Sequence, residues 1–230
     1  MAAHEQNVLR SSWRGGLPVE VHLNAADVAT PTPPEPIFLL LRRNSYLPVA
    51  LKPAVEVFQE HVMELGAPEL WFESEATVAH DGRTVTASLP LNWHVPAGVL
   101  YDVLSSGTRR PWRIIVHFHR LPVDKVPRCS DATMRSFFFN AVKQAIYIES
   151  GSVQSWFKLP VAQQDKFYQS LVEADSDLFL GPHSTVATPL QNLRAIPVRV
   201  LGCSPNPSPD PNPNPSPNTN PNWDDLQRFV

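Results

Sequence analysis

The sequence predicts an α+β protein in which a mixed sheet precedes a helix-rich region and a proline-rich tail. Three observations support this prediction: strand-like alternation in the first half, helical periodicity from Asp131 onward, and alternating prolines after Ser204. The chain has 230 residues, of which 43% are hydrophobic, so it is long enough to bury a core. Its length favours one or two small domains.

The first half alternates between strand and helix patterns. Val19, Val21 and Leu23 alternate with polar residues, which is typical of a half-buried strand. The predicted order is strand, strand, helix, strand, short helix, strand, over 18–24, 37–43, 55–66, 69–75, 95–104 and 111–121. This order matches a β-grasp, or ubiquitin-like, domain, in which a helix packs across a mixed sheet, and we assign 8–122 to it. A ferredoxin-like fold would require a helix between the first two strands, where this chain has the proline loop 30–36.

The second half has a helical period. On a wheel of about 100° per residue, one face of the segment 131–148 is formed by Met134, Phe137, Phe138, Ala141, Ala145 and Ile148. Shorter helices are predicted over 153–159 and 160–180, which gives a helical domain over 129–181. The segment 194–202, "RAIPVRVLG", is predicted to be a strand that begins another domain.

The low-complexity tail covers 203–230. Within it, "SPNPSPDPNPNPSPNTNPN" places proline at nearly every second position, and proline cannot donate a backbone hydrogen bond. Asparagine and serine offer little surface to bury. We therefore expect the tail to be disordered.

Composition excludes several classes of protein. The net charge of −3 lacks the basic excess of a nucleic-acid-binding protein. Two cysteines are too few for a disulfide framework or a structural zinc site, and they indicate a reducing compartment. No segment is apolar for long enough to form a signal peptide or a membrane span, so we expect a soluble protein whose membrane contact is peripheral.

Four residues are candidates for metal ligands or catalytic acids. His117 and His119 alternate on a predicted strand, but no third ligand follows at metal spacing, so we favour solvent-facing strand residues. Asp175 and Asp177 could serve as a general acid and base, but an acidic loop at the end of a helix is the simpler interpretation of this pair, and we favour it. We predict no metal and no cofactor.

One basic cluster stands out. Arg109, Arg110 and Arg113 surround Trp112, which fits a turn between helix and strand; contact with an anionic membrane or RNA is the alternative. The chain contains no hydrolase or metalloprotease motif and no glycine-rich phosphate loop.

Lys143 is the only lysine between Lys125 and Lys158. On the helical wheel it lies opposite the centre of the apolar face, so we expect it to be exposed. Phe139, Ile146 and Tyr147 flank it outside the core arc, which indicates a docking surface around the amine. Three roles remain open: a solvating charge, a placed amine, and a Schiff-base lysine, the last of which would need a pocket with acid–base partners.

Six motifs follow one another in a distinctive order: "VLRSSWRGGLPVEVHLN", "PIFLLLRRNSYLPV", "LWFESE", "LPLNWHVPAGVLYDVL", "PWRIIVHFHRLP" and "FFNAVKQAIYI". Over about 8–201 this pattern resembles the autophagy protein 5 family, especially its plant and algal forms. The resemblance implies two ubiquitin-like domains around a helix-rich domain. The connector 182–202 would then hold at most the start of the second one, so we expect a truncated, divergent or mispredicted form.

The resemblance also implies a role for Lys143, in "NAVKQA". Members of the family accept a ubiquitin-like modifier, autophagy protein 12, and Lys143 occupies the acceptor position. An isopeptide bond requires a primary amine on a long stem, which only lysine supplies. The resemblance thus implies a conjugation substrate and scaffold, with catalysis supplied by an E2-like conjugating enzyme.

Further partners are implied by the same resemblance. The family's conjugate binds a coiled-coil protein, autophagy protein 16, and promotes transfer of autophagy protein 8 to phosphatidylethanolamine. The coiled-coil protein contacts both ubiquitin-like domains, so its binding here depends on the second one. We expect a cytoplasmic protein recruited to the membrane of the preautophagosomal structure; the alternative is an unconjugated ubiquitin-like interaction module.

Overall fold

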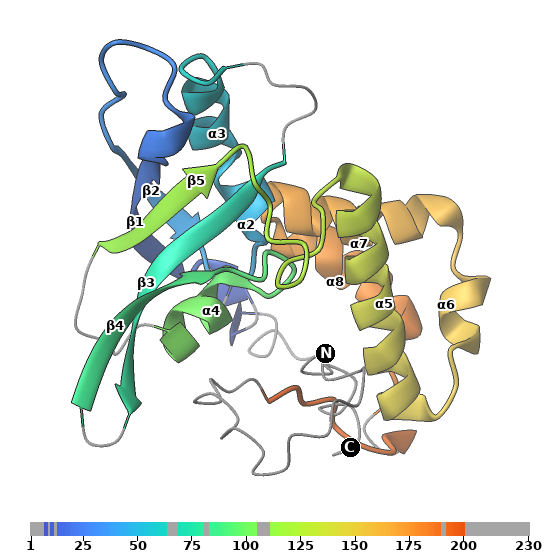
Figure 1. Ribbon diagram of the computed structural model, residues 1–230. Coiled ribbons are helices and arrows are strands. Elements are labelled where there is room, and N and C mark those ends of the chain that lie inside the picture. Colours follow the sequence, from blue (N-terminus) through green and yellow to red (C-terminus); the bar gives the residue numbers. More distant parts are fainter. Residues whose placement is uncertain are drawn as a thin grey trace, which may run out of the picture.

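The computed structural model describes residues 7–8, 10–11, 13–63, 69–80, 83–104, 111–189 and 192–200, with the backbone alone over 76–80 and 83–86. Its first half is a mixed five-stranded sheet with the strand order β2-β1-β5-β3-β4 (Figure 1). The strands are β1 (Gly16–Leu23), β2 (Ile37–Arg42), β3 (Trp71–His80), β4 (Arg83–Pro90) and β5 (Trp112–His117). The central strands β1 and β5 are parallel, whereas the other neighbouring strands are antiparallel. This arrangement confirms the predicted β-grasp domain.

The alternating residues of β1 pair on both sides of the strand. Val19 lies opposite Leu39 of β2 and opposite Trp112 of β5. Val19 and Val21 are at most 1% exposed, because a strand with two neighbours and a covered face buries every second side chain. The expected pairing of β1 is confirmed.

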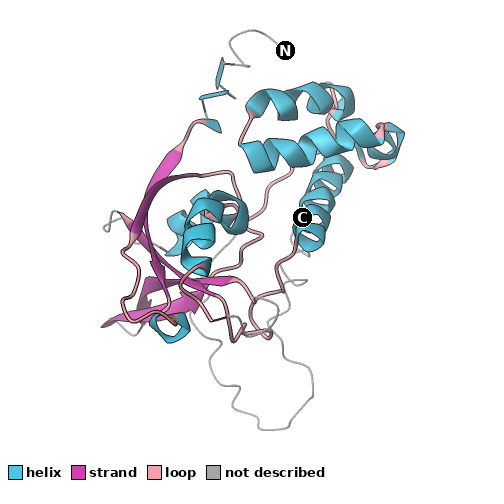
Figure 2. Cartoon of the chain, turned by 90° about the horizontal axis from the view of Figure 1, so that it is seen from above, coloured by secondary structure: helices cyan, strands magenta, loops and turns pink. Residues whose placement is uncertain are grey.

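Short helices cover the inner face of this sheet. They are the 3-10 helix η1 (Ala25–Asp27), α2 (Leu47–Ala50), α3 (Lys52–Gln59) and α4 (Ala97–Leu104). Figure 2 shows the sheet curving around helices of this half, while the remaining helices lie to one side. Leu51 and Phe58 from the helical layer are fully buried in the same core as Ile114 of β5.

The predicted end of α3 was wrong. The predicted helix continued to Gly66, but α3 ends at Gln59. The chain leaves the helix because Val62 forms a β-bridge with Val28, and Ala29 N–H donates to the carbonyl of His61 at 2.8 Å. Tertiary pairing therefore outweighs the helical period.

The sequence also missed β4. One strand was predicted where the structure has a β3–β4 hairpin, with His80 opposite Arg83 in register. The signal was present, since Asp81-Gly82 is a dipeptide that favours a two-residue hairpin turn and alternating residues follow it.

The second half consists of α5 (Asp131–Ser150), α6 (Gln154–Lys158), α7 (Val161–Glu173) and α8 (Ser176–Val186). A capping box starts α5: Ser130 Oγ accepts from Thr133 N–H at 3.2 Å, and Thr133 Oγ1 accepts from Ser130 N–H at 2.8 Å. Gly151 ends the helix with φ 76°, in the left-handed region that glycine tolerates.

Helix α5 contributes to two cores. Met134 belongs to the core of the sheet domain, Ile146 belongs to the helical core with Trp156, and Phe138 packs against both. Phe137 was expected in a single apolar face, but it is 38% exposed and packs against the rings of Trp93 and His94. A helix packed from two directions has no single buried stripe, so the wheel misjudged this face.

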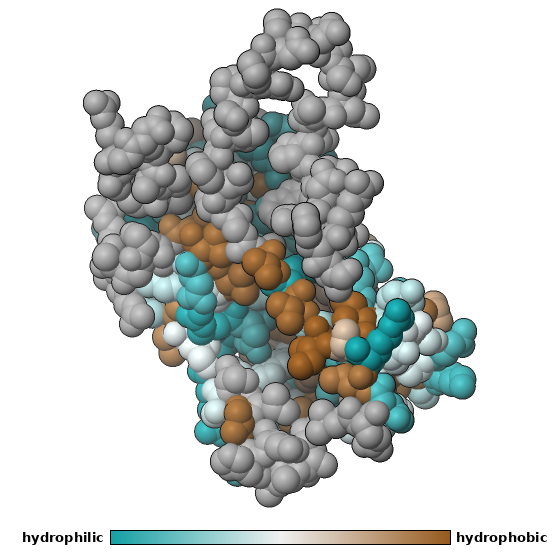
Figure 3. Space-filling view, turned by 90° about the horizontal axis from the view of Figure 1, so that it is seen from below, coloured by the Kyte–Doolittle hydropathy of each residue, from teal (hydrophilic) through white to brown (hydrophobic). Residues whose placement is uncertain are grey.

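The segment 192–200 is not a strand, contrary to the prediction. It lies beside α5: the Arg194 N–H donates to the Glu149 carbonyl at 2.7 Å, and Arg199 Nη2 donates to Gln144 Oε1 at 2.6 Å. Its apolar side chains, Ile196, Val198 and Val200, are between 62% and 76% exposed. Figure 3 shows hydrophobic side chains gathered in a band across the lower face of the molecule. The predicted disorder of 203–230 concerns residues outside the described part of the chain.

Within the described ranges, the helices all fall short of the length and apolar content that crossing a membrane would require.

Candidate functional site

Lys143 lies in the second half of α5 and is half-buried, so the prediction of an exposed side chain was wrong. Its Nζ is 6.0 Å from the centroid of the Trp156 ring. The amine therefore lies over an aromatic face, within the range at which a cation is attracted to the ring.

The chain after α5 brings Trp156 to this position. Ser150 Oγ donates to the carbonyls of Ile146 and Ser152, and the positive φ of Gly151 turns the chain into α6. Trp156 is 2% exposed and packs against Phe139 and Phe167, with ring centroids at 5.1 and 5.8 Å. Sequence reasoning missed Trp156, because no periodic pattern connects residues on two separate helices.

The three residues predicted to surround Lys143 lie in different environments. Phe139 is half-buried and packs against Trp156 and Tyr168. Ile146 is only 4% exposed, because it packs in the helical core with residues of α6, α7 and α8, so its place in an exposed ring was wrong. Tyr147 is 54% exposed and is the one member of the three that offers open surface.

Lys143 differs from the other four lysines of the chain. Lys52, Lys125, Lys158 and Lys166 are exposed, whereas Lys143 is half-buried. Lys52 forms an ion pair with Glu56 at 3.8 Å. Among the described residues, no carboxylate lies within ion-pair distance of the Lys143 amine. The contact that the structure gives the Lys143 amine is therefore with the Trp156 ring.

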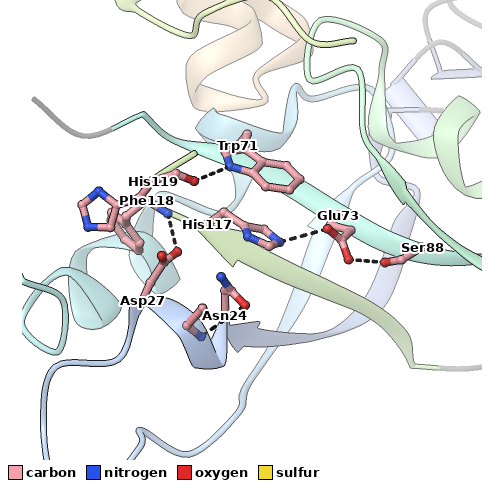
Figure 4. Close-up of polar contacts among 9 residues, drawn as sticks. Asn24, Asp27, Trp71, Glu73, Ser88, His117, Phe118 and His119 are labelled. Atoms are coloured by element: carbon pink, nitrogen blue, oxygen red, sulfur yellow. Dashed lines mark hydrogen bonds and ion pairs between the residues drawn. The ribbon is translucent and has the colours of Figure 1, made fainter. Parts of the chain in front are cut away.

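The histidines considered as metal ligands do not form a shared site. His117 is 8% exposed, stacks on Trp71 with centroids 3.6 Å apart, and places Nε2 3.2 Å from Glu73 Oε2 (Figure 4). Burial lowers the pKa of His117, and the Glu73 carboxylate opposes that shift. His117 is therefore a buried residue that connects β5 to β3, and the expectation that it faces solvent was wrong.

His119 follows the end of β5, and its backbone carbonyl accepts a hydrogen bond from Trp71 Nε1 at 2.9 Å. Figure 4 shows its imidazole well apart from that of His117. In the part of the chain that the structure describes, no three His, Cys, Asp or Glu side chains gather as metal ligands.

The acidic pair at the start of α8 has a structural role. Asp175 accepts from the Asp177 N–H at 2.7 Å and caps the helix, while Asp177 pairs with Arg10 at 2.9 Å. Of the basic cluster, Arg113 is exposed on β5, and Arg109 and Arg110 lie outside the described residues.

Two family models match the chain. The model described as "Autophagy protein ATG5, UblA domain" matches residues 12–118, and the one described as "Autophagy protein ATG5, alpha-helical bundle region" matches residues 131–185. The second match includes α5 with Lys143 and α6 with Trp156.

Curated relatives and a solved structure agree with these matches. Autophagy protein 5 of Oryza sativa subsp. indica is 31% identical over 173 residues, which cover 75% of this chain and 42% of the relative. The Arabidopsis thaliana protein of the same name is 27% identical over 179 residues, which cover 76% and 49%. The chain thus spans less than half the length of these plant relatives.

The crystal structure of Kluyveromyces marxianus Atg5 has a TM-score of 0.66 and 22% identity to this chain, and the match covers 84% of this chain and 73% of that one. At this identity the likeness shows a shared fold. With both family models matched in order along one chain, and the plant relatives aligned over three quarters of it, the chain belongs to the autophagy protein 5 family.

Proposed function

We propose that the chain is a scaffold of the autophagy machinery that accepts a ubiquitin-like modifier, autophagy protein 12, on Lys143. Family membership supports the role in autophagy. The observation that carries the choice of residue is the placement of Lys143: it alone among five lysines is half-buried, and it lies over the Trp156 ring. Lys143 also occupies the acceptor position that the family resemblance implies.

In the proposed reaction, the Lys143 amine converts a thioester of the modifier into an amide. The neutral Lys143 amine attacks the carbonyl carbon of the modifier's C-terminal thioester on the conjugating enzyme. A C–N bond forms, the C–S bond breaks, the enzyme's cysteine leaves as a thiolate, and one amine proton passes to a base or to water. The product is an isopeptide, which resists thiol reductants.

Catalysis belongs, in this proposal, to the E2-like enzyme. A lysine must lose a proton before it attacks, and the described neighbours of Lys143 supply no carboxylate at ion-pair distance to receive that proton. The conjugating enzyme can supply the base and exclude water. The chain itself contributes a positioned amine on a rigid helix.

The later steps concern the assembled complex. We propose that the conjugate promotes transfer of autophagy protein 8 to phosphatidylethanolamine, and that it is recruited from the cytoplasm to the preautophagosomal structure membrane. Binding of the coiled-coil protein autophagy protein 16 depends on surface that includes a second ubiquitin-like domain. The chain spans less than half the length of its plant relatives, so binding of this partner depends on a region beyond the part that they share with this chain.

A second candidate function, an unconjugated ubiquitin-like interaction module, has one observation in its favour. Phe38 and Leu40 on the edge strand β2 are 66% and 68% exposed. An edge strand with outward apolar side chains is a surface on which a partner's strand can pair.

The test is a reconstituted reaction with the activating and conjugating enzymes, followed by tryptic digestion and mass spectrometry. We expect a branched peptide in which the modifier's C-terminus is attached to Lys143. A branch at Lys158 or Lys166 would reject the site. If the folded protein forms no adduct, the interaction-module function replaces the proposed one.

A further inference from the structure

Trp156 forms a rigid platform beneath the Lys143 amine. Its side chain is 2% exposed and is fixed by Phe139 and Phe167, whose rings lie at 5.1 and 5.8 Å. The Gln164 Nε2 group donates to the carbonyls of Leu159 and Trp156, at 3.0 and 3.5 Å, which holds the end of α6 against α7. A ring packed on several sides cannot change its orientation when the lysine moves.

The spacing along α5 explains how the amine reaches the ring. Phe139 and Lys143 are four residues apart, so they lie one above the other on the same side of the helix. Phe139 packs against the Trp156 ring with its own ring, and Lys143 extends its Nζ over the same tryptophan at 6.0 Å. Lys143 is half-buried, as expected for a lysine whose aliphatic stem lies along an apolar surface.

The kind of contact matters for reactivity. A carboxylate beside an ammonium favours the charged form and competes with the reacting partner for its position. An aromatic face attracts the ammonium more weakly and offers no full negative charge. Lys143 has the ring and, among the described residues, no carboxylate at ion-pair distance.

We propose that Trp156 is a positioning residue for the Lys143 amine, which its ring holds in one place so that the amine is presented to an incoming acyl group. This inference rests on the proposed function for its purpose, although the contact itself does not. Holding the stem before the encounter removes part of the entropy that ordering a long flexible side chain would cost during the reaction.

The contact can be measured on the whole protein without any conjugating enzyme. Reductive methylation with ¹³C-formaldehyde labels the five lysines, and Lys143→Arg identifies the Lys143 signal by its loss. We expect that signal to be displaced upfield of the other four by the tryptophan ring current. A Lys143 signal at the position of the exposed lysines would overturn the proposal, and this outcome requires no variant of Trp156.

Two substitutions separate positioning from packing. Trp156→Leu should return the Lys143 signal to the common position, whereas Trp156→Phe should keep part of the displacement. The matched control is Phe157→Leu on the same helix, because Phe157 is 65% exposed and no contact joins it to Lys143 among the described residues. That control should leave the Lys143 signal unchanged, and a change equal to that of Trp156→Leu would overturn the assignment.

A second experiment measures the rate of adduct formation by the unmethylated protein in a single-turnover conjugation reaction. Trp156→Leu should slow adduct formation about two- to fivefold, as expected for loss of one cation–π contact, and Trp156→Phe should recover part of the rate. Equal rates for wild type and a folded Trp156→Leu would reject positioning. If Lys143 shows the ring-current shift but forms no adduct, the proposed function fails while the contact stands.

Discussion

The imidazole of His94 lies nearly flat against the ring of Phe137, with ring centroids 4.5 Å apart and an angle of 26° between the planes. His94 precedes α4 in the sheet domain, and Phe137 belongs to α5, so the pair joins the two halves of the chain. Beside it, Trp93 Nε1 donates to the Pro127 carbonyl at 2.7 Å. This junction, together with Met134 in the sheet-domain core, packs α5, which carries Lys143, against the sheet domain.

The first prediction is that acid weakens this junction. Burial, with a smaller contribution from Arg199, lowers the pKa of His94 to about 4, against an ordinary value of 6.5. The folded state therefore favours neutral His94. Its contribution to the free energy of unfolding is present above pH 6.5 and is lost as the pH falls to about 4, on the order of 3 kcal/mol in all.

Urea unfolding of wild type and His94→Gln at several values between pH 7.5 and pH 4 measures this contribution. The variant lacks the titrating group, so its stability should fall less steeply over that range. His22→Gln is a control near the surface, where His22 pairs with Glu20 at 2.7 Å. Identical pH slopes for wild type and His94→Gln would contradict the prediction.

A second prediction concerns the start of α5. Ser130→Ala removes the side-chain oxygen that accepts from Thr133 N–H, and we expect a loss of about 1 kcal/mol in the free energy of unfolding. Ser136→Ala is the matched control, because Ser136 is exposed within the same helix. Chemical denaturation should separate the two variants, and equal midpoints would show that the capping box contributes nothing.

Two glycines should respond to alanine with opposite signs. Gly151→Ala introduces a Cβ at φ 76° and within 2.8 Å of Arg194 Nη1, so we expect destabilisation by about 1 kcal/mol. Gly181 lies within α8 with nothing near the position of an added Cβ, so Gly181→Ala should stabilise by up to about 1 kcal/mol. Thermal or urea unfolding measures both; a shift in the same direction for the two variants would be inconsistent with these backbone conformations.

Neighbouring residues on α5 should differ in the cost of truncation. Ile146 is 4% exposed in the helical core, so Ile146→Ala should cost about 2–5 kcal/mol of stability. Tyr147 is 54% exposed, and Tyr147→Ala should change stability by about 0.5 kcal/mol or less. If Ile146→Ala proves as mild as Tyr147→Ala in urea unfolding, the helical core has been placed on the wrong face.

The sheet domain was largely predictable from the sequence. Alternation in β1 and the apolar run of β2 depend on local side-chain period, and a half-buried strand reveals that period directly. The end of α3 was not predictable in the same way, since the bridge between Val62 and Val28 joins residues far apart in the chain. The β4 strand was predictable in principle, because Asp81-Gly82 is a dipeptide that favours a hairpin turn between two strands.

The candidate site was predictable in part. The isolation of Lys143 among the lysines is a property of the sequence, and it selects one helix, α5, for the candidate site. The half-burial of Lys143 and the burial of Ile146 depend on the helices after α5, because α6, α7 and α8 form a core on a side of α5 that the wheel treats as open. A helical wheel represents one helix and one core, whereas α5 borders two cores.

A chain with a single lysine is the sharpest test of Lys143 as the acceptor. In one variant Lys52, Lys125, Lys158 and Lys166 become arginine and Lys143 remains; in the matched variant only Lys143→Arg is made. Arginine keeps the charge and most of the stem but cannot act as the nucleophile at neutral pH. Circular dichroism and urea unfolding check that both variants are folded.

Adduct formation with the ubiquitin-like modifier, measured in the reconstituted reaction under thiol reductant, gives the answer. We expect the variant with Lys143 alone to form the adduct at a rate close to wild type, and Lys143→Arg to form none. An adduct on folded Lys143→Arg at comparable yield, or none on the variant that retains only Lys143, would contradict the assignment of this residue.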